Sequence, residues 1–411
     1  MENLILLIFI ITYIFVAIQN IPGIKIDRPA GVTIGSTLLI LTGLLTLEQA
    51  YYFIDWNVIT FLLGMMVMIA YLEFAGFFGY MAFWLVRISH STSALLWATI
   101  ISSALLSAFF VNDTICLLFT PIILKATRYL KLNPIPYLIA IATASNIGSA
   151  LTITGNPQNM YIGIQSAIPF LRFSLFMLVP VVIGIAMLYV IISLIHRKEI
   201  NRQPLPPFEA RPPELKRALT YKSLGALAVT LVLFIAGLKY PLAALIGASI
   251  IFLISRVPPR HALREMDWSV LLFFAGLFIV MGAFEKTGYM TKVLIFARNH
   301  VSHNNLSGFL GLSSLAVILS NVVSNVPAVI LLKPLISNLG GGERLWLLLA
   351  MASTFAGNLT LVGSVANLIV AEKAQSRKVH LGFLSYLKVG LPITVLTILV
   401  GAGWIFWMAG K

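Results

Sequence analysis

The chain has 411 residues, of which 59% are hydrophobic and 10% are charged, and its mean hydropathy is +0.96. About a quarter of the residues of a soluble domain are charged, so this composition excludes a soluble globular protein and indicates a polytopic membrane protein. The net charge of +14 does not point to a nucleic-acid partner, because the Lys and Arg residues gather in loops, as is typical of loops that stay in the cytoplasm.

The first apolar stretches are long enough to cross a membrane. We expect no cleavable signal peptide, because Met1 and Glu2 lead into the first stretch without a basic segment or a small-residue cleavage site. The predicted spans are residues 4–18, 31–47 and 55–73. The short aromatic stretch 77–86, which Arg87 follows, is expected to form a helix in the membrane interface.

Residues 102–124 are apolar except for Asn112-Asp113-Thr114 at their centre, here called the first tip. An aspartate at the centre of a membrane helix costs about 2.5–3.5 kcal/mol of insertion free energy, and such residues usually face a cavity and bind an ion, a proton or a substrate. The alternative is a structural aspartate that caps a broken helix, although one residue can do both. The segment of about 94–129 forms either one kinked span or a re-entrant hairpin.

Residues 136–170 form an interrupted span whose break is rich in small and polar residues, among them Ser145, Asn146, Thr154, Asn156 and Asn159. Glycines and a proline open the helix there and leave backbone N–H and C=O groups without helical partners. Freed carbonyl groups suit a cation, and the N-termini of half-helices suit an anion. A plain span, 174–195, follows.

Residues 197–219 form the longest polar stretch, with five prolines and an excess of basic over acidic residues. This composition is typical of a cytoplasmic linker between two halves of a membrane protein. We therefore predict a first repeat at residues 1–196 and a second at residues 220–411.

The second half repeats the plan of the first. Five residues recur at a single offset of 212: Asp55, Trp56, Gly64, Glu73 and Gly76 correspond to Asp267, Trp268, Gly276, Glu285 and Gly288. The predicted elements are spans at 223–238, 241–254 and 267–285, a short segment at 290–297, a hairpin at about 306–339, a broken span at about 346–371, and a last span within 381–408. Ser324-Asn325-Val326, here called the second tip, corresponds to the first tip, and in both halves a proline follows the tip asparagine by nine residues.

The distribution of charge gives the relative orientation of the two halves. The loop before Asp55 contains no Lys or Arg, whereas the equivalent loop before Asp267 contains Arg256, Arg260 and Arg264. By the positive-inside rule these loops lie on opposite faces of the membrane, so the repeats are inverted. We predict an all-α polytopic membrane protein of two inverted repeats, each with about five transmembrane helices and one re-entrant hairpin, and with broken helices at the midplane. The linker and the loop 372–380 would then be cytoplasmic, and both termini would lie outside.

Inverted repeats of this kind bring two tips and two helix breaks together. The predicted substrate- and ion-binding residues are therefore Asn112, Asp113, Thr114, Ser145, Asn146, Thr154, Asn156, Asn159, Ser324, Asn325, Asn358, Gly363, Ser364 and Asn367. Neither tip contains Arg or Lys, so a dianion would rely on helix dipoles, amides and bound cations, and a neutral polyol-like solute would suit the site equally well. Asp113 is the single titratable group at the tips, and we assign it the role of proton carrier or cation ligand.

Other polar residues in apolar surroundings have simpler explanations. Lys333 lies about two turns from the second tip, where snorkelling to the interface competes with a role in transport. Glu73 and Glu285 stand at span ends, which favours structural or interfacial roles. Cys116 could contact a thiophilic solute, but a buried packing cysteine is commoner. No metal-ligand cluster and no nucleophile–base arrangement is visible, so we expect no metal site and no enzyme.

Several of these motifs resemble the ion transporter superfamily, which includes arsenite efflux permeases, divalent anion–sodium symporters and D-type sodium/proton antiporters. The resemblance covers nearly the whole chain. Asn112-Asp113-Thr114 followed by Thr120-Pro121, and Asn325-Val326-Pro327 in the second half, are similar to the tips of arsenite permeases. Gly155-Asn156-Pro157-Gln158-Asn159 is more similar to the Pro-Pro-Asn turn of the anion symporters, and Asn367 matches the asparagine of that turn. Those symporters carry Ser-Asn-Thr at both tips for paired sodium sites, and this chain departs from that pattern.

The resemblance implies a secondary active transporter of the inner, cytoplasmic membrane. Its Asn-Asp tip favours arsenite and antimonite efflux by proton antiport through alternating access. Sodium-coupled symport of di- or tricarboxylates or inorganic anions, and sodium/proton antiport, are alternatives, and a passive solute channel is an alternative from another class. The expected partners are a small inorganic or anionic substrate and the lipid bilayer, with no nucleic acid and no cofactor beyond a proton or sodium gradient. A soluble ATPase on the linker and a homo-oligomer are left open.

Overall fold

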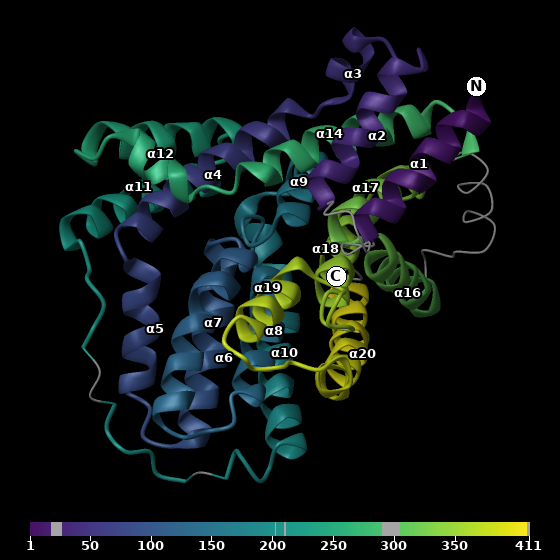
Figure 1. Ribbon diagram of the computed structural model, residues 1–411. Coiled ribbons are helices and arrows are strands. Elements are labelled where there is room, and N and C mark those ends of the chain that lie inside the picture. The colour runs from purple at the N-terminus through teal and green to yellow at the C-terminus, as the bar shows by residue number, and fades with distance from the viewer. Residues whose placement is uncertain (18–26, 202, 209–210, 290–304, 409–411) are drawn as a thin grey trace.

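The computed structural model describes residues 1–17, 27–201, 203–208, 211–289 and 305–408, and within these ranges the chain folds into helices without a strand (Figure 1). The predicted segment 290–297 lies outside the described residues. Seven described helices are long and apolar enough to span a membrane. They are α4 (Trp56–Phe74), α6 (Thr92–Phe109), α10 (Phe170–Ile195), α11 (Arg217–Ile235), α14 (Trp268–Glu285), α16 (Leu306–Val323) and α20 (Phe383–Met408). The prediction of an all-α polytopic membrane protein is confirmed.

The remaining helices are shorter. They are α1 (Glu2–Ala17), α2 (Arg28–Leu41), α3 (Leu47–Phe53), α5 (Phe77–Arg87), α7 (Asn112–Tyr129), α8 (Ile135–Ser149), α9 (Pro157–Ser166), α12 (Tyr240–Ile254), α13 (Pro259–Ala262), the 3-10 turn η1 (Leu263–Glu265), α17 (Asn325–Asn338), α18 (Glu343–Ala356) and α19 (Val365–Gln375). The chain bends by 116° between α12 and the α13–η1 segment. The predicted span 31–47 ends earlier, at Leu41, because Gly43 turns the chain with φ +70° and Thr46 caps α3 together with Gln49.

Equivalent helices of the two halves occupy equivalent positions. Helices α1, α2, α4, α11, α12 and α14 pack mainly against one another and are here called the scaffold. Within it α4 packs on α12 and α14 packs on α2, so the third span of each half contacts the second span of the other. Figure 1 shows α4, α11, α12 and α14 lying across one end of the helices α5 to α8 and α10.

The recurring residues of the sequence repeat explain this scaffold. Asp55 and Asp267 are the N-caps of α4 and α14, where their carboxylates accept hydrogen bonds from the backbone N–H groups of the first turn. A Cβ atom on Gly64 would lie 2.7 Å from the backbone of Ala244 in α12, and one on Gly276 would lie 2.9 Å from Val32 in α2. The glycines therefore allow the same close helix contact in each half.

The segment around the first tip is a hairpin and not a kinked span. Helices α6 and α7 pack against each other, and their outer ends both reach the linker. The Thr92 N–H at the start of α6 donates to the Gln203 carbonyl at 3.1 Å, and the Tyr129 ring at the end of α7 lies 5.3 Å from the Phe208 ring. The outer ends of both arms thus lie on the same side of the molecule, as the hairpin interpretation expects.

The second hairpin, α16–α17, opens toward the other end of α10. Phe309 near the start of α16 packs on Phe406 at the end of α20, with ring centroids 5.5 Å apart. Glu343, shortly after α17, pairs with Arg172 at the start of α10 at 2.7 Å. By contrast Trp97 in the first hairpin stacks on Tyr189, near the end of α10. The 26 residues of α10 extend over about 39 Å, so the hairpins enter from opposite ends, as inverted repeats require.

Candidate functional site

The two broken helices and the two tips meet at the centre of the protein. Helix α8 ends at Ser149 and α9 begins at Pro157, while α18 ends at Ala356 and α19 begins at Val365. The first break is almost entirely buried, whereas the second break is exposed at Val362. Asn156 caps α9 by accepting the Asn159 backbone N–H at 2.8 Å. The first tip is anchored to its own break, because the Asn112 N–H donates to the Gly155 carbonyl at 3.1 Å.

Asn146, near the end of α8, joins the first tip to the break of the other half. Its Oδ1 accepts from the Asn112 amide at 2.9 Å and from the Ser364 hydroxyl at 3.2 Å. Its Nδ2 donates to Asn358 at 3.0 Å and to Asn367 at 3.1 Å. Five of the predicted binding residues therefore form one buried hydrogen-bonded network.

Thr354 has the corresponding role in the second half. It stands one residue after Ala352-Ser353, just as Asn146 follows Ala144-Ser145. Its hydroxyl accepts from the Asn156 amide at 3.3 Å and donates to Asn159 at 3.4 Å. Thr354 is absent from the predicted binding residues, although the alignment of the two breaks places it opposite Asn146.

A cavity of about 260 Å³ lies where both tips face the scaffold. Its wall includes the first tip, the second tip and the starts of α9 and α19, namely Pro157, Gln158, Ser364 and Val365. Asp113 is partly exposed there, and Gln158 is 4% exposed. The opposite wall consists of residues of α2, α4, η1 and α14. Polar side chains of both repeats therefore line a single cavity.

The predicted site residues divide into two groups. Those that line the cavity are Asn112, Asp113, Thr114, Ser324, Asn325 and Ser364. Those that lie behind its wall are Ser145, Asn146, Thr154, Asn156, Asn159, Asn358, Gly363 and Asn367. The second group helps to position the first, because Asn146 bonds both Asn112 and Ser364. Thr154 shares a hydrogen bond of 3.0 Å with Thr152, which in turn bonds the Ala108 carbonyl of α6.

Four charged residues of the scaffold also line the cavity: Arg28, Glu73, Glu265 and Asp267. Neither tip carries a basic residue, but Arg28 at the start of α2, outside the repeat motifs, also lines the cavity and donates to Ser324 of the second tip. A bound anion would therefore have a guanidinium beside the helix dipoles and amides. The interfacial assignment of Glu73 is likewise incomplete, since the end of α4 faces the cavity. These residues were missed because each stands at a helix end, where charge is ordinarily interfacial.

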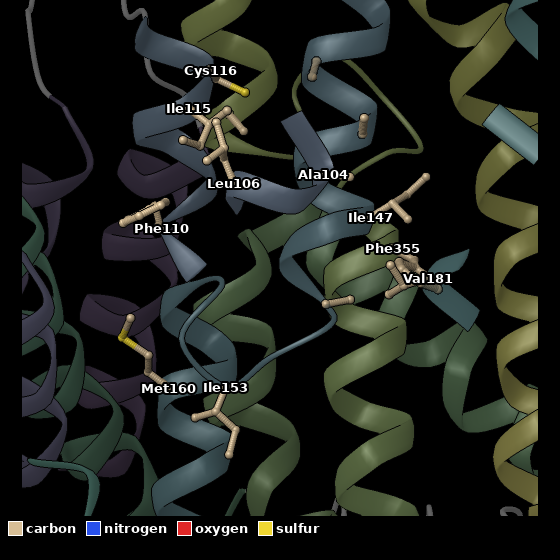
Figure 2. Close-up of a cluster of buried hydrophobic side chains, with 14 of the residues drawn as sticks. Ala104, Leu106, Phe110, Ile115, Cys116, Ile147, Ile153, Met160, Val181 and Phe355 are labelled. Atoms are coloured by element: carbon tan, nitrogen blue, oxygen red, sulfur yellow. The ribbon is translucent and has the colours of Figure 1, made fainter. Parts of the chain in front are cut away.

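Cys116 belongs to the packing behind the first tip and not to the cavity. Figure 2 shows it within the buried apolar cluster that also contains Ile115, Leu106 and Ile147. Its Sγ lies 3.0 Å from the Ser145 hydroxyl, and the residue is fully buried. The packing interpretation is therefore supported. Lys333 does not line the cavity either.

Comparison with known proteins gives the family. Residues 5–355, more than half of the chain, match the family model of the citrate transporters, CitMHS. The chain is 29% identical to the 46 kDa membrane protein of Mycobacterium leprae, with 98% of this chain and 97% of that protein covered. It is 28% identical to the silicon efflux transporter LSI3 of Oryza sativa subsp. japonica, with 96% and 95% covered.

Two further similarities extend along the chain. It is 27% identical to a Dictyostelium discoideum protein named "Putative transporter arsB", with 96% of this chain and 90% of that protein covered. The fold matches the crystal structure of the Alcanivorax borkumensis YdaH transporter with a TM-score of 0.61 and 15% identity, over 100% of this chain and 98% of the other. The matched family, the silicon efflux transporter and the YdaH transporter are membrane transporters and not enzymes. The chain therefore belongs to the citrate transporter family, CitMHS, within the ion transporter superfamily of secondary transporters.

Proposed function

We propose that this transporter exports arsenite and antimonite, as their uncharged hydroxides, in exchange for protons. The main support for the proposal is the charge of the side chains that line the cavity. Among the described residues that line the cavity, four supply carboxylates, Asp113, Glu73, Glu265 and Asp267, and Arg28 alone supplies a positive charge. Such a chamber repels a free di- or trianion, because charges of one sign in a cleft with apolar walls disfavour ligands of that sign.

An uncharged hydroxide fits this wall better. The amides of Asn112, Asn325 and Gln158 and the hydroxyl groups of Thr114 and Ser324 supply both donors and acceptors. Arsenous acid and silicic acid are both uncharged polyhydroxides near neutral pH, and one relative is named a silicon efflux transporter. The resemblance of the Asn-Asp tip to arsenite permeases points the same way.

Alternating access follows from the division between scaffold and tips. Asp113 takes up a proton or releases it as the body of tips and breaks moves against α2, α4 and α14. The end of α4 that carries Glu73 also contacts the linker, since the Lys216 N–H donates to the Ala75 carbonyl at 2.9 Å. The linker is expected to be cytoplasmic, so this placement supports loading of the substrate from the cytoplasm.

A second candidate is sodium-coupled symport of a carboxylate. The description of the family as citrate transporters favours it, and so does Arg28, whose guanidinium is the side chain best suited to a carboxylate. In that case Asp113 would be a cation ligand.

Uptake of arsenite into everted vesicles under an imposed proton gradient, with and without sodium, tests the proposal. We expect proton-dependent, sodium-independent uptake that Asp113→Asn abolishes. Asp55→Asn is the matched control, because Asp55 caps α4 outside the cavity and asparagine caps equally well. Absence of arsenite uptake together with sodium-driven accumulation of citrate in right-side-out vesicles would refute arsenite export and support the second candidate.

A further inference from the structure

Arg28 occupies a fixed position on the scaffold. It is the first residue of α2, and the preceding Asp27 caps that helix by accepting the Ala30 N–H at 2.9 Å. Pro29 restricts the backbone at the next position. Helix α2 packs on α1 and α14, so a side chain that reaches the tips from this point joins the scaffold to the part that carries the site.

The guanidinium interacts with both tips, by a hydrogen bond to the second and electrostatically with the first. Its Nη1 donates to the Ser324 hydroxyl of the second tip at 3.3 Å. It lines the same cavity as Asp113 of the first tip and interacts electrostatically with that carboxylate. Ser324 lies between α16 and α17 with φ +78°, a conformation that a side chain rarely adopts and that its surroundings must maintain.

We propose that Arg28 is a positioning residue that links the proton on Asp113 to the movement of the second tip. While Asp113 is ionised, its charge holds the guanidinium between the tips and keeps Ser324 against α2. When Asp113 is protonated, the half-buried guanidinium loses the compensating charge on the first tip, which is costly, and it withdraws from Ser324. The proton-coupling part of the proposed function is the premise of this inference.

The other charged groups around the cavity allow that withdrawal. Glu73 reaches it from α4, Glu265 from η1 and Asp267 from the start of α14, and no Lys or His is among the described lining residues. These three carboxylates stand on the scaffold with Arg28, so they can accept its charge without pulling on either tip. Asp113 is thus the one acidic group whose ionisation attracts Arg28 toward the moving part.

A thiol on the cavity wall can report the movement without any substrate. Leu117 is one helical turn beyond Asp113, lines the cavity and is partly exposed. Since Cys116 is the chain's single cysteine, Leu117→Cys in a Cys116→Ser background gives one reactive site. Its rate of labelling by a membrane-impermeant methanethiosulfonate is measured against pH. Each rate is divided by that of the same cysteine in an Asp113→Asn background, which removes the titration of the thiol itself.

We expect a single pH midpoint for labelling. Removing the positive charge in Arg28→Gln favours protonation of Asp113 and moves the midpoint up by about one pH unit, equivalent to about 1.4 kcal/mol. Arg28→Lys keeps the charge and leaves the midpoint within a few tenths of a unit. Ser324→Ala removes the hydrogen bond alone, so it keeps the midpoint and reduces the amplitude.

An unchanged midpoint in Arg28→Gln, or an equal shift in Ser324→Ala, would overturn the proposal. If Arg28→Gln also shifts the pH dependence of the undivided labelling rate in the Asp113→Asn background, the proposal is overturned, because the effect would then not pass through Asp113. Labelling requires no arsenite, so a failure of arsenite transport and a failure of the Arg28 link are separate results.

Discussion

Asn146 and Thr354 occupy equivalent positions in the two repeats, and each is hydrogen-bonded by the broken helix of the opposite repeat. Asn367 accepts from Asn146, and the amide of Asn156 donates to Thr354. The two breaks are thus crossed, and the centre of each half has hydrogen bonds to the other half. A substitution at the centre should therefore affect both halves of the site together.

The first prediction concerns this network. Asn146→Ala leaves the buried polar atoms of Asn112, Asn358 and Asn367 with fewer partners, at a cost of about 1–3 kcal/mol for each unsatisfied group. We expect the melting temperature of the detergent-solubilised protein to fall by at least about 5 °C. Asn338→Ala is the control, since Asn338 is exposed and bonds only within its own helix turn in the described residues. Equal stability of the two variants would contradict the importance of the network.

The second prediction concerns helix packing in the scaffold. Gly64→Ala places a Cβ atom against the backbone of Ala244, which cannot move aside as a flexible side chain would. Overpacking of this kind costs about 1–3 kcal/mol, so we expect a lower melting temperature. Gly225→Ala provides the comparison, because a Cβ atom there meets nothing within 4 Å. If Gly64→Ala is as stable as Gly225→Ala, then α4 and α12 do not approach each other as closely as described.

The third prediction is that transport requires the carboxylate of Asp113 but not the thiol of Cys116. Cys116 is buried behind the first tip and bonds Ser145, so the substrate does not meet its sulfur. Cys116→Ser preserves a polar contact with Ser145, and we expect transport within about twofold of the wild type. The same vesicle assay applies, with Asp113→Asn as the inactive reference. Loss of arsenite transport in Cys116→Ser would instead show thiol ligation of the substrate.

The fourth prediction is a pH dependence of stability at the end of α10. Burial lowers the pKa of the His196 imidazole below its ordinary value, although the Glu199 carboxylate 3.9 Å away opposes the shift. The unfolded chain then binds a proton below about pH 6.5 more readily than the folded chain, so stability falls as the pH falls through this range. We expect His196→Gln to reduce the loss of melting temperature between about pH 7.5 and about pH 5.5. His90→Gln, at an exposed histidine, should leave that loss unchanged.

Much of the fold was predictable from the sequence, because the duplication left residues that recur at a fixed spacing. The Asp and Gly positions that recur at an offset of 212 are the caps and close contacts of α4 and α14. Both tips were identified from polar residues inside apolar stretches, and both line the cavity. The orientation of the hairpins was predicted from loop charge, and the contacts at the two ends of α10 agree with it.

The scaffold side of the site was not predictable in the same way. Arg28 and Glu265 lie outside the apolar spans, where a charge carries no insertion cost and gives no signal. Their place in the cavity depends on how α2, η1 and α14 converge, which is a property of packing between distant segments. The hydrogen bond from Asn146 to Asn358, which joins the two halves, could not be predicted for a related reason. A comparison of the repeats shows which residues are equivalent, but it does not show which residues are in contact.

The crossed breaks also have an evolutionary consequence. Asn146 and Thr354 each bond a side chain of the opposite break, so two separate copies of one repeat would have to insert in opposite orientations in the same membrane to form these bonds. Two orientations made independently would give mismatched copies and wasted chains. Joining the copies through residues 197–219 makes both repeats part of one polypeptide. Their ratio is then always one to one, and their opposite orientations are set together when the chain is made. Once joined, the halves were free to diverge in sequence. The first tip now carries Asp113 at the position where the second tip carries Val326, and both residues line the cavity.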